Sequence, residues 1–272
     1  MRLKEALRGK LTTKQLAQLT GSFDIIGSIA KLDIAPALRK KEKVIAAAVL
    51  AQNPAVKTVV RKNSIHGGKY RLQKVKVIAG KKTKETVHRE SGVAAMLDIE
   101  KCYFSVRSSS ERLRIASLVK PGEKVLVMFS GVGIYPLILA KHSKAAHIWG
   151  VELNPTAHKY AMENVKLNKA RNVMVLRGNV RTVVPKLGKF DRIVMPLPKD
   201  AERFLPLALK TCKKSGMVHL YGFLREDAIP ATMERVTKIC KKAKRRCKVL
   251  RTVKCGAYAS RVYRVCTDIE VR

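Results

Sequence analysis

Residues 128–136, MFSGVGIYP, decide the fold of the larger part of this chain. They continue the apolar run KVLVMF, which follows turn residues and is typical of a strand, and they lead into a stretch of helical character. Gly131 and Gly133 therefore fall in the turn between a strand and a helix, where glycine lets the backbone turn tightly and approach a ligand. The stretch predicts the first strand-to-helix turn of a doubly wound α/β sheet that binds a ligand.

The flanking sequence repeats this alternation of helix and strand. We expect a helix at 111–119 with Ser110 as its cap, because serine accepts hydrogen bonds from the first N–H groups of a helix. Two further helical stretches, 155–170 and 201–214, separate apolar runs expected as strands, which are 147–153, 173–178, 190–197 and 216–224. Residues 245–271 read as two strands that close the sheet antiparallel. The alternation predicts a parallel sheet with helices on both faces.

Residues 1–100 show a series of short helical and strand patterns without the regular alternation seen later in the chain. This pattern predicts a smaller α+β module in front of the doubly wound, Rossmann-like domain of residues 101–272. The elements expected in this module are helices at 13–19 and 38–51 and strands at 22–34, 57–62 and 70–80. Residues 80–92, GKKTKETVHRESG, read as an exposed, positively charged connection.

The charge of the chain points to its partner. Fifty-seven Lys and Arg stand against 20 Asp and Glu, a net charge of +37, and such a balance favours a polyanion, with nucleic acid as the first candidate. No run of about 18 apolar residues is present to span a membrane, and the basic N-terminus lacks the apolar core of a signal peptide. We therefore expect a cytoplasmic protein, with its six cysteines as free thiols because no metal-binding spacing occurs.

An acidic residue follows the glycine turn at a sequence spacing typical of nucleoside-binding sites. Glu152 ends the next expected strand, 19 residues after Gly133, where a carboxylate can accept both hydroxyl protons of a ribose. Pro136 stands where a dinucleotide fingerprint has its third glycine, so the pattern fits S-adenosylmethionine better than a pyrophosphate. The residues expected to bind this cofactor are Tyr103, Phe129, Ser130, Gly131, Val132, Gly133, Glu152, Leu153, Asn179, Val180 and Pro196, with Asn179 at the adenine edge.

The fourth expected strand ends in MPLPK, residues 195–199. Ligands of such sheets lie beyond the carboxyl ends of the strands, so this segment is expected to line the mouth of the site. Two prolines fix the shape of the loop and leave carbonyls free to accept hydrogen bonds. Pro196 is therefore placed beside the chemistry, while Pro198 and Lys199 are placed against the substrate, with Lys199 on a phosphate.

Eight segments spread along the chain resemble the archaeal and eukaryotic tRNA (guanosine-37, N1)-methyltransferases. They are SFDIIGSIA (22–30), GKYR (68–71), VHRESG (87–92), YFSVRSSSERLR (103–114), MFSGVGIYP (128–136), VELNP (151–155), ENVKLNKA (163–170) and FDRIVMPLPK (190–199). The YFSxR and SxER pair is the most specific, because methyltransferases at large do not share it. The resemblance implies a class I methyltransferase sheet, an RNA-binding N-terminal module, S-adenosylmethionine as cofactor and tRNA as substrate.

The resemblance also implies a mechanism. Methylation of guanine at N1 requires loss of a ring proton while negative charge builds on O6. In this family the glutamate of SxER is the general base and the arginine of GxYR stabilises O6, which are Glu111 and Arg71 in this chain. Tyr103, Phe104 and Arg107 would shape the pocket around the target base. His88 is expected to be structural or to face RNA, and no metal is required by this chemistry.

The chain departs from the family pattern at three positions. Val127 and Pro196 stand where many members have aspartate and asparagine, and Asn179 stands in place of the adenine-side aspartate. We also expect the additional N-terminal module of longer relatives to be absent, so that basic segments such as 81–84 and 241–246 contribute to the grip on tRNA.

Three functions remain open on this evidence. The first is methyl transfer to N1 of guanosine 37 by a monomer without an obligate protein partner. The second is transfer of the aminocarboxypropyl group of the same cofactor to a wyosine precursor in tRNA, which shares the adenosine site. The third is a catalytically silent RNA-binding protein on the same fold.

Overall fold

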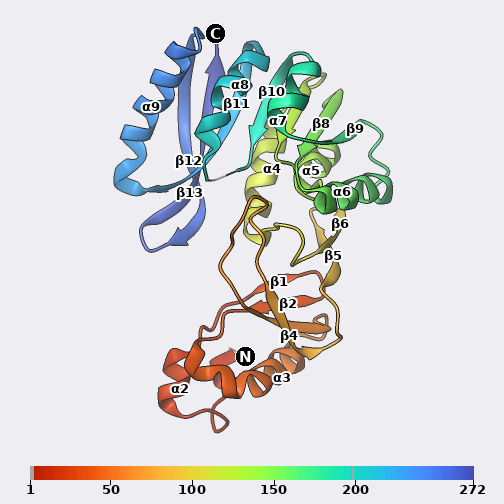
Figure 1. The fold of residues 1–272 in the computed structure, drawn as a ribbon, viewed down its shortest axis with the longest axis vertical. Coiled ribbons are helices and arrows are strands. Elements are labelled where there is room, and N and C mark those ends of the chain that lie inside the picture. The colour runs from red at the N-terminus through yellow and green to blue at the C-terminus, as the bar shows by residue number, and fades with distance from the viewer. Residues whose placement is uncertain (1–2, 198) are drawn as a thin grey trace. The chain divides into compact units, whose positions relative to one another are not determined.

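The computed structural model describes residues 3–197 and 199–272. It divides into two compact units, shown as ribbons in Figure 1. The N-terminal unit comprises the chain up to Arg89 together with Ala94–Val106, and the C-terminal unit comprises Glu90–Val93 and Arg107–Arg272. A four-residue segment of the second unit therefore interrupts the first.

The N-terminal unit is built on a four-stranded sheet in the order β1-β2-β3-β4. Its strands are β1 (Asp24–Ile26), β2 (Ile29–Leu32), β3 (Thr58–Lys62) and β4 (Val75–Gly80). Only the β2–β3 pair among these is parallel. The helices are α1 (Leu3–Ala6), α2 (Thr13–Gln18), the 3₁₀ helix η1 (Pro36–Lys41) and α3 (Glu42–Gln52), and their apolar residues, such as Leu38 and Ile45, close the core on Val59.

The predictions for residues 22–34 and 80–92 were wrong. Residues 22–34 form the hairpin of β1 and β2 rather than one strand, because Gly27 turns the chain with φ +54 at a point where a Cβ would clash with Thr86 and Val87. Residues 80–92 are not simply an exposed connection, since β5 (Glu85–Glu90) pairs with β6 (Val93–Asp98). Exposed residues alternate along β5 with less exposed ones, but the exposed set includes the apolar Val87 and the less exposed set includes His88 and Glu90, so the sequence shows no alternation of polar and apolar residues.

The C-terminal unit confirms the doubly wound α/β prediction. Its seven-stranded sheet has the order β12-β13-β11-β10-β7-β8-β9, and the strands from β11 to β9 in this row are parallel to one another. These strands are β7 (Lys124–Met128), β8 (His147–Glu152), β9 (Val173–Arg177), β10 (Phe190–Met195) and β11 (Cys212–Arg225). As expected, the last two strands, β12 (Cys247–Ala259) and β13 (Val262–Val271), are antiparallel.

Helices cover both faces of this sheet (Figure 1). They are α4 (Ser109–Leu118), α5 (Ile134–His142), α6 (Pro155–Leu167), α7 (Val180–Val183), α8 (Leu205–Thr211) and α9 (Ile229–Lys242). Buried residues of α7, α8 and α9 pack in one core with Leu126 and Met128 of β7. Alternate residues of β10 face the other way, where Arg192 reaches the carbonyl of Leu118 at the end of α4.

Several helix boundaries differ from the predictions, as in the helices expected at 111–119 and 201–214. The helix expected at 111–119 begins at Ser109, and its N-cap is Ser108 rather than Ser110. Ser108 occupies the N-cap position, but its hydroxyl makes no capping hydrogen bond to the helix and instead accepts one from Arg264. The helix expected at 201–214 ends at Thr211, where the chain enters β11 at Cys212.

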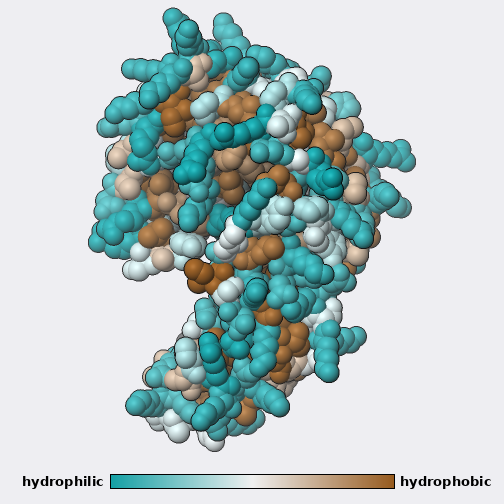
Figure 2. Space-filling view, viewed as in Figure 1, coloured by the Kyte–Doolittle hydropathy of each residue, from teal (hydrophilic) through white to brown (hydrophobic). Residues whose placement is uncertain are grey.

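Hydrophilic side chains cover most of the face seen in Figure 2, in both units. Among the residues that the structure describes, no helix is long and apolar enough to cross a bilayer. The described cysteines are free thiols, and four of the six are buried.

A buried ion pair attaches the start of the second unit to α4. Arg112 forks onto Glu90, with 2.6 Å from Nε to Oε1 and 2.6 Å from the second nitrogen to Oε2. The two side chains are only 4% and 6% exposed. Charges this deeply buried are stable only as a pair. If one is removed, the other still carries the free-energy cost of desolvation and loses the attraction that offset it.

We predict that Arg112→Ala lowers the free energy of unfolding in urea by about 3–5 kcal/mol, since the buried Glu90 carboxylate would lose its ion pair with Arg112. The control is Arg225→Ala, which breaks an exposed pair with Asp227 and should change the same quantity much less, because water screens exposed ion pairs. Equal effects of the two substitutions would contradict the role given to the buried pair.

Candidate active site

The loop after β7 is shaped for close approach of a ligand. Three of its residues lie in the left-handed region, with φ of 62° at Phe129, 58° at Gly131 and 84° at Gly133. The Ser130 N–H donates to the carbonyl of Val151 at 3.0 Å, and Gly133 N–H donates to the Ser130 carbonyl at 3.0 Å. The loop is thus tied to β8 and closes into a tight turn at the start of α5.

Glu152, at the end of β8, holds the loop through its carboxylate. Its two oxygens accept the N–H groups of Gly131 and Asn154, each at 2.7 Å. Burial raises the pKa of Glu152, against the opposing effect of these backbone hydrogen bonds. A carboxylate has about four lone-pair positions, so both oxygens keep capacity for the two hydroxyl protons of a ribose.

The residues present fit S-adenosylmethionine. The Ser130 hydroxyl is buried and has no hydrogen-bond partner among the residues that the structure describes, as expected for a polar loop that a polar ligand completes. A Cβ on Gly150 would come within 2.9 Å of that hydroxyl, and one on Gly133 within 3.3 Å of Ala161. Small residues are therefore needed on two sides of the loop.

The other residues predicted to bind the cofactor follow the ends of neighbouring parallel strands. Leu153 follows β8, Val180 begins α7 after β9, and Pro196 follows β10. Asn179 caps α7 by accepting the Arg181 N–H at 3.0 Å, which orients its amide. Because parallel strands end at one edge of the sheet, these residues lie along the same edge as the glycine loop.

The residues predicted to face the substrate lie in short connecting segments, where the structure describes them. Lys199 lies in the turn after β10, and Arg107 is an exposed residue of the 3₁₀ helix η2 (Val106–Ser108). Pro198 lies outside the residues that the structure describes. Val127, one of the departures from the family pattern, is fully buried in β7.

Arg71 and Tyr103 come together in the N-terminal unit. The Arg71 guanidinium lies 5.1 Å from the centre of the Tyr103 ring, and the His66 ring meets the same tyrosine edge-on at 5.2 Å. Arg71 is not on a strand, contrary to the prediction of a strand at 70–80, but on a turn with φ 54°. His88, expected to be structural or RNA-facing, accepts the Gly27 N–H at 3.2 Å and packs on Phe104.

Glu111 is a buried carboxylate in the first turn of α4, 4% exposed. Arg114 forks onto it at 2.7 and 2.8 Å, and the Tyr221 hydroxyl donates to Oε1 at 2.5 Å. Burial raises the pKa of Tyr221 well above its ordinary value, so this hydroxyl remains a donor. Glu111 is therefore much more than a surface acid at a helix N-terminus: its orientation is fixed by three hydrogen bonds.

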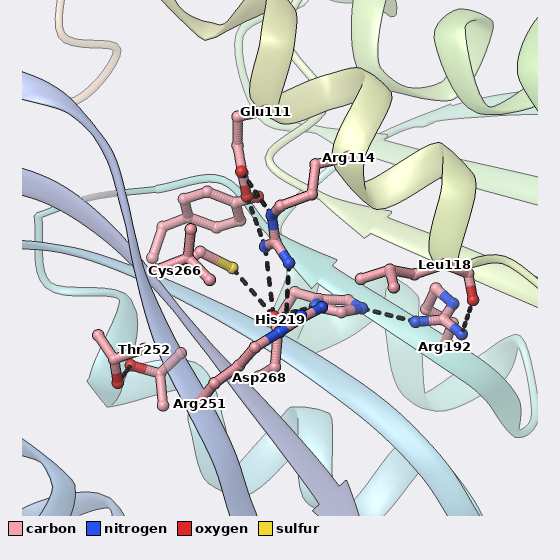
Figure 3. A network of polar contacts seen from close by, with 12 residues as sticks. Glu111, Arg114, Leu118, Arg192, His219, Arg251, Thr252, Cys266 and Asp268 are labelled. Carbon is pink, nitrogen blue, oxygen red and sulfur yellow. Dashed lines mark hydrogen bonds and ion pairs between the residues drawn. The ribbon is translucent and has the colours of Figure 1, made fainter.

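The Arg114 guanidinium continues to Asp268 on β13, 2.9 Å away (Figure 3). His219, Cys266 and Asp268 place ligand atoms within 4.8 Å of one another, a spacing that metal sites use. Arg114 and Arg251 already donate to Asp268, and a divalent cation would have to displace these guanidinium groups. We therefore assign the cluster to an ion-pair network.

Sequence reasoning missed an aromatic cavity of about 550 Å³ beside this network. Tyr221 lines it, and so does Tyr258, which is 63% exposed and stacks on Phe223 at 4.0 Å. Lys199 stands on the rim. The only sequence signal was the pair of aromatic residues on two strands 35 positions apart, 223 and 258, which have no common motif.

Comparison with known proteins identifies the family. The model of the TRM5/TYW2 methyltransferase domain matches residues 86–250, more than half of the chain. The chain belongs to this family. A second model, the TYW2 N-terminal domain, matches residues 3–83. Membership confirms the resemblance drawn from the motifs and the prediction of an S-adenosylmethionine-dependent enzyme.

Two curated members of the TRM5/TYW2 family show how the relatives divide. The tRNA (guanine(37)-N(1))-methyltransferase Trm5b of Pyrococcus abyssi is 39% identical over 93% of this chain and 76% of that protein. The tRNA(Phe) (4-demethylwyosine(37)-C(7)) aminocarboxypropyltransferase of Pyrococcus horikoshii is 32% identical over 99% of this chain and 96% of that protein.

Solved structures of the family agree with the fold. The complex of aTrm5 and tRNALeu matches with a TM-score of 0.87 at 29% identity, over 100% of this chain and 78% of that one. TYW2 of P. horikoshii in complex with MeSAdo matches with a TM-score of 0.82 at 28% identity, over 99% and 97% of the two chains.

We predict that affinity for S-adenosylmethionine falls as the pH is lowered, beginning at a higher pH than an ordinary glutamate would cause. The raised pKa of Glu152 means that the acceptor carboxylate is lost earlier on acidification. Calorimetric titration between pH 4.5 and 8 measures this, with Glu152→Gln as the control that should bind weakly and show a flat profile. Unchanged wild-type affinity across the range would contradict the assignment of Glu152.

Proposed function

We propose that this protein transfers a methyl group from S-adenosylmethionine to N1 of guanosine 37 in tRNA. One observation carries the proposal: Glu111 is a buried, fully oriented carboxylate next to an open aromatic cavity, with Tyr221 contacting both. General-base removal of the N1 proton needs such a carboxylate in a fixed position. The 39% identity to a relative named as a tRNA (guanine(37)-N(1))-methyltransferase supports it.

The residues have distinct roles in this reaction. Glu111 accepts the N1 proton, and negative charge then builds on O6, where the Arg71 guanidinium stabilises it. Tyr103, packed against Arg71, holds that side chain in place. When bound, S-adenosylmethionine supplies an electrophilic methyl group on a positively charged sulfur. The 129–133 loop and Glu152 would hold it, and Asn179 and Pro196 line the same edge.

The division of labour between the two parts of the chain is also proposed. Residues 1–100 bind and position RNA, and residues 101–272 hold the cofactor and Glu111. The net charge of +37 supports a tRNA substrate, because each phosphate contact releases counterions. We propose a monomeric, cytoplasmic enzyme, since neither proton removal nor methyl transfer needs a second subunit.

We predict that the purified protein adds one methyl group to guanosine in unmodified tRNA transcripts. Nucleoside mass spectrometry after digestion identifies the product. Glu111→Ala and Arg71→Ala should each lower the methylation rate by about 10²–10⁴-fold, the range of a lost general base or oxyanion donor. A Glu111→Ala variant that methylates at the wild-type rate would remove Glu111 from the mechanism.

A second function is favoured by one finding. Residues 3–83 match the model of the TYW2 N-terminal domain, and a full-length relative is an aminocarboxypropyltransferase. Pro196, where many methyltransferases of the family have asparagine, also separates this chain from them. The same digestion decides when the assay is repeated on tRNA that carries a wyosine precursor: a mass gain of one aminocarboxypropyl group on that precursor would replace the first proposal by the second.

The Tyr258–Phe223 stack is proposed as the platform for a nucleotide next to the target base. One face of Phe223 is taken by Tyr258, and Arg264 lies 5.8 Å from the same ring. An exposed aromatic ring beside cations stacks a splayed base without regard to sequence.

We predict that Tyr258→Ala weakens tRNA binding about tenfold, because stacking of one base on an aromatic ring contributes about 1–3 kcal/mol. Filter binding at fixed salt measures the affinity. Tyr258→Phe keeps the ring and should bind like the wild type. Unchanged affinity of the alanine variant would exclude the platform.

A further inference from the structure

A continuous set of charged and polar side chains runs through the interior of the C-terminal unit from Glu111 to Glu123. Figure 3 shows its middle, where Arg114, Asp268, His219 and Arg192 follow one another. Arg192 forks onto Glu123 at 2.7 and 2.9 Å and donates to His219 Nε2 at 2.7 Å. The network joins α4, β10, β11 and β13, which lie far apart in the sequence.

His219 is neutral in this network. Burial lowers the pKa of His219, and this outweighs the opposing effect of Asp268. Its Nδ1 lies 2.6 Å from Asp268 and must carry the proton, since a carboxylate only accepts. Its Nε2 then accepts from Arg192. The neutral ring therefore adds no positive charge beside Asp268. Its tautomer is fixed by Asp268 at Nδ1 and by Arg192 at Nε2.

Asp268 is the most heavily bonded acid of the set. Burial alone would raise its pKa, but hydrogen bonds from His219 and Arg114, joined by Arg251, hold the pKa of Asp268 well below its usual range. Arg251 donates to Oδ2 at 2.8 Å from a side chain that is 51% exposed. Asp268 therefore remains ionised and accepts hydrogen bonds from the guanidinium groups of Arg114 and Arg251.

Few of the groups around Glu111 are charged. Those that face it are Arg114 from its own helix, Tyr135 from α5, Tyr221 from β11, Cys255 from β12, and Cys266 and Asp268 from β13. Burial raises the pKa values of both tyrosines and both cysteines, so these four are neutral. The neighbouring Arg112 is paired with Glu90. Arg114 is thus the cation bonded directly to Glu111, and Asp268 is the second carboxylate bonded to that cation.

We propose that Asp268 is a positioning residue for the reaction: by sharing Arg114 with Glu111, it keeps that carboxylate both oriented and basic. The inference rests on the proposed role of Glu111 as the general base. A guanidinium bound to Glu111 alone would orient it but weaken it as a base, because an adjacent cation favours the ionised form. The Asp268 carboxylate offsets the effect of the cation on the basicity of Glu111, and the two hydrogen bonds from Arg114 to Glu111 remain.

The same arrangement suits the state after proton transfer. When the N1 proton moves from guanine to Glu111, the partly buried Arg114 loses the negative charge of one partner. Its contacts to Asp268, at 2.9 and 3.4 Å, remain, so the cation is not left unpaired. The proton is later released from Glu111 to solvent, which restores the starting network.

Two substitutions test the proposal because they must act in opposite directions. Asp268→Asn removes the competing carboxylate, so Glu111 binds Arg114 alone and becomes a weaker base. In a plot of the single-turnover methylation rate against pH, the fall in rate on the acid side (the acid limb) should then move to lower pH by about one unit. The rate on the plateau above it should also decrease. Arg251→Gln leaves Asp268 entirely to Arg114, and the acid limb should move to higher pH.

A matched control removes a similar charge elsewhere. Arg272 is 55% exposed and pairs with Glu270 at 2.7 Å, so Arg272→Gln loses one paired, half-exposed cation of the same unit and should leave the acid limb in place. A purely structural role of Asp268 predicts a loss of stability or rate with an unshifted limb. Shifts of both variants in the same direction, or of neither, would overturn the proposal.

Direct titration gives the same comparison without turnover. Protein labelled with [13Cδ]glutamate, with the Glu111 signal assigned from Glu111→Gln, shows the pH at which that carboxylate takes up a proton. The midpoint should fall in Asp268→Asn and rise in Arg251→Gln. If tRNA is not methylated, the proposed function fails while this titration still decides on the network. If methylation requires Glu111 but the midpoints do not move, the network proposal alone fails. Arg251→Gln, a half-exposed site, covers the case in which Asp268→Asn does not fold.

Discussion

Helix α4 is attached to the seven-stranded sheet by buried charges, and the candidate site depends on that attachment. Arg192 on β10 donates to the last carbonyl of the helix, at Leu118, while Arg114 near its start reaches Asp268 on β13. Arg192 is buried and needs its partners, and Arg114 is partly buried between two carboxylates, so this position of the helix satisfies both arginines. That position fixes Glu111 one turn before Arg114. The orientation of the proposed base is thus a consequence of how the helix is held.

The parts of the site that depend on local sequence could be predicted, and those that depend on distant partners could not. The loop from Phe129 to Gly133 and the acid Glu152 follow from a strand, a turn and a spacing, and the structure brings them together. The link between Arg114 and Asp268 spans 154 positions, and no periodicity in the sequence reports it. The strand β5 was missed for a related reason, because its partner β6 rather than its own composition makes it a strand.

The distribution of acidic residues sharpens the meaning of the net charge. There are only 20 of them against 57 basic residues, and several lie inside the C-terminal unit as partners of arginine or backbone groups. Glu90, Glu111, Glu152 and Asp268 are of this kind. Acids used in the interior do little to offset the cations that face solvent. The field met by an approaching phosphate backbone is therefore more uniformly positive than the composition alone suggests.

The segment Glu90–Val93 belongs to the C-terminal unit although the chain on both sides of it belongs to the N-terminal one. No single cut in the backbone separates the two units cleanly. A fragment that starts after residue 100 loses Glu90 and keeps Arg112, a buried cation whose counter-ion has gone with the other piece. The two units fold as distinct bodies, but one cannot be exchanged for its counterpart from a relative by a single replacement of sequence. Recombination that exchanged the N-terminal part between relatives would have to carry this short segment in a matching form.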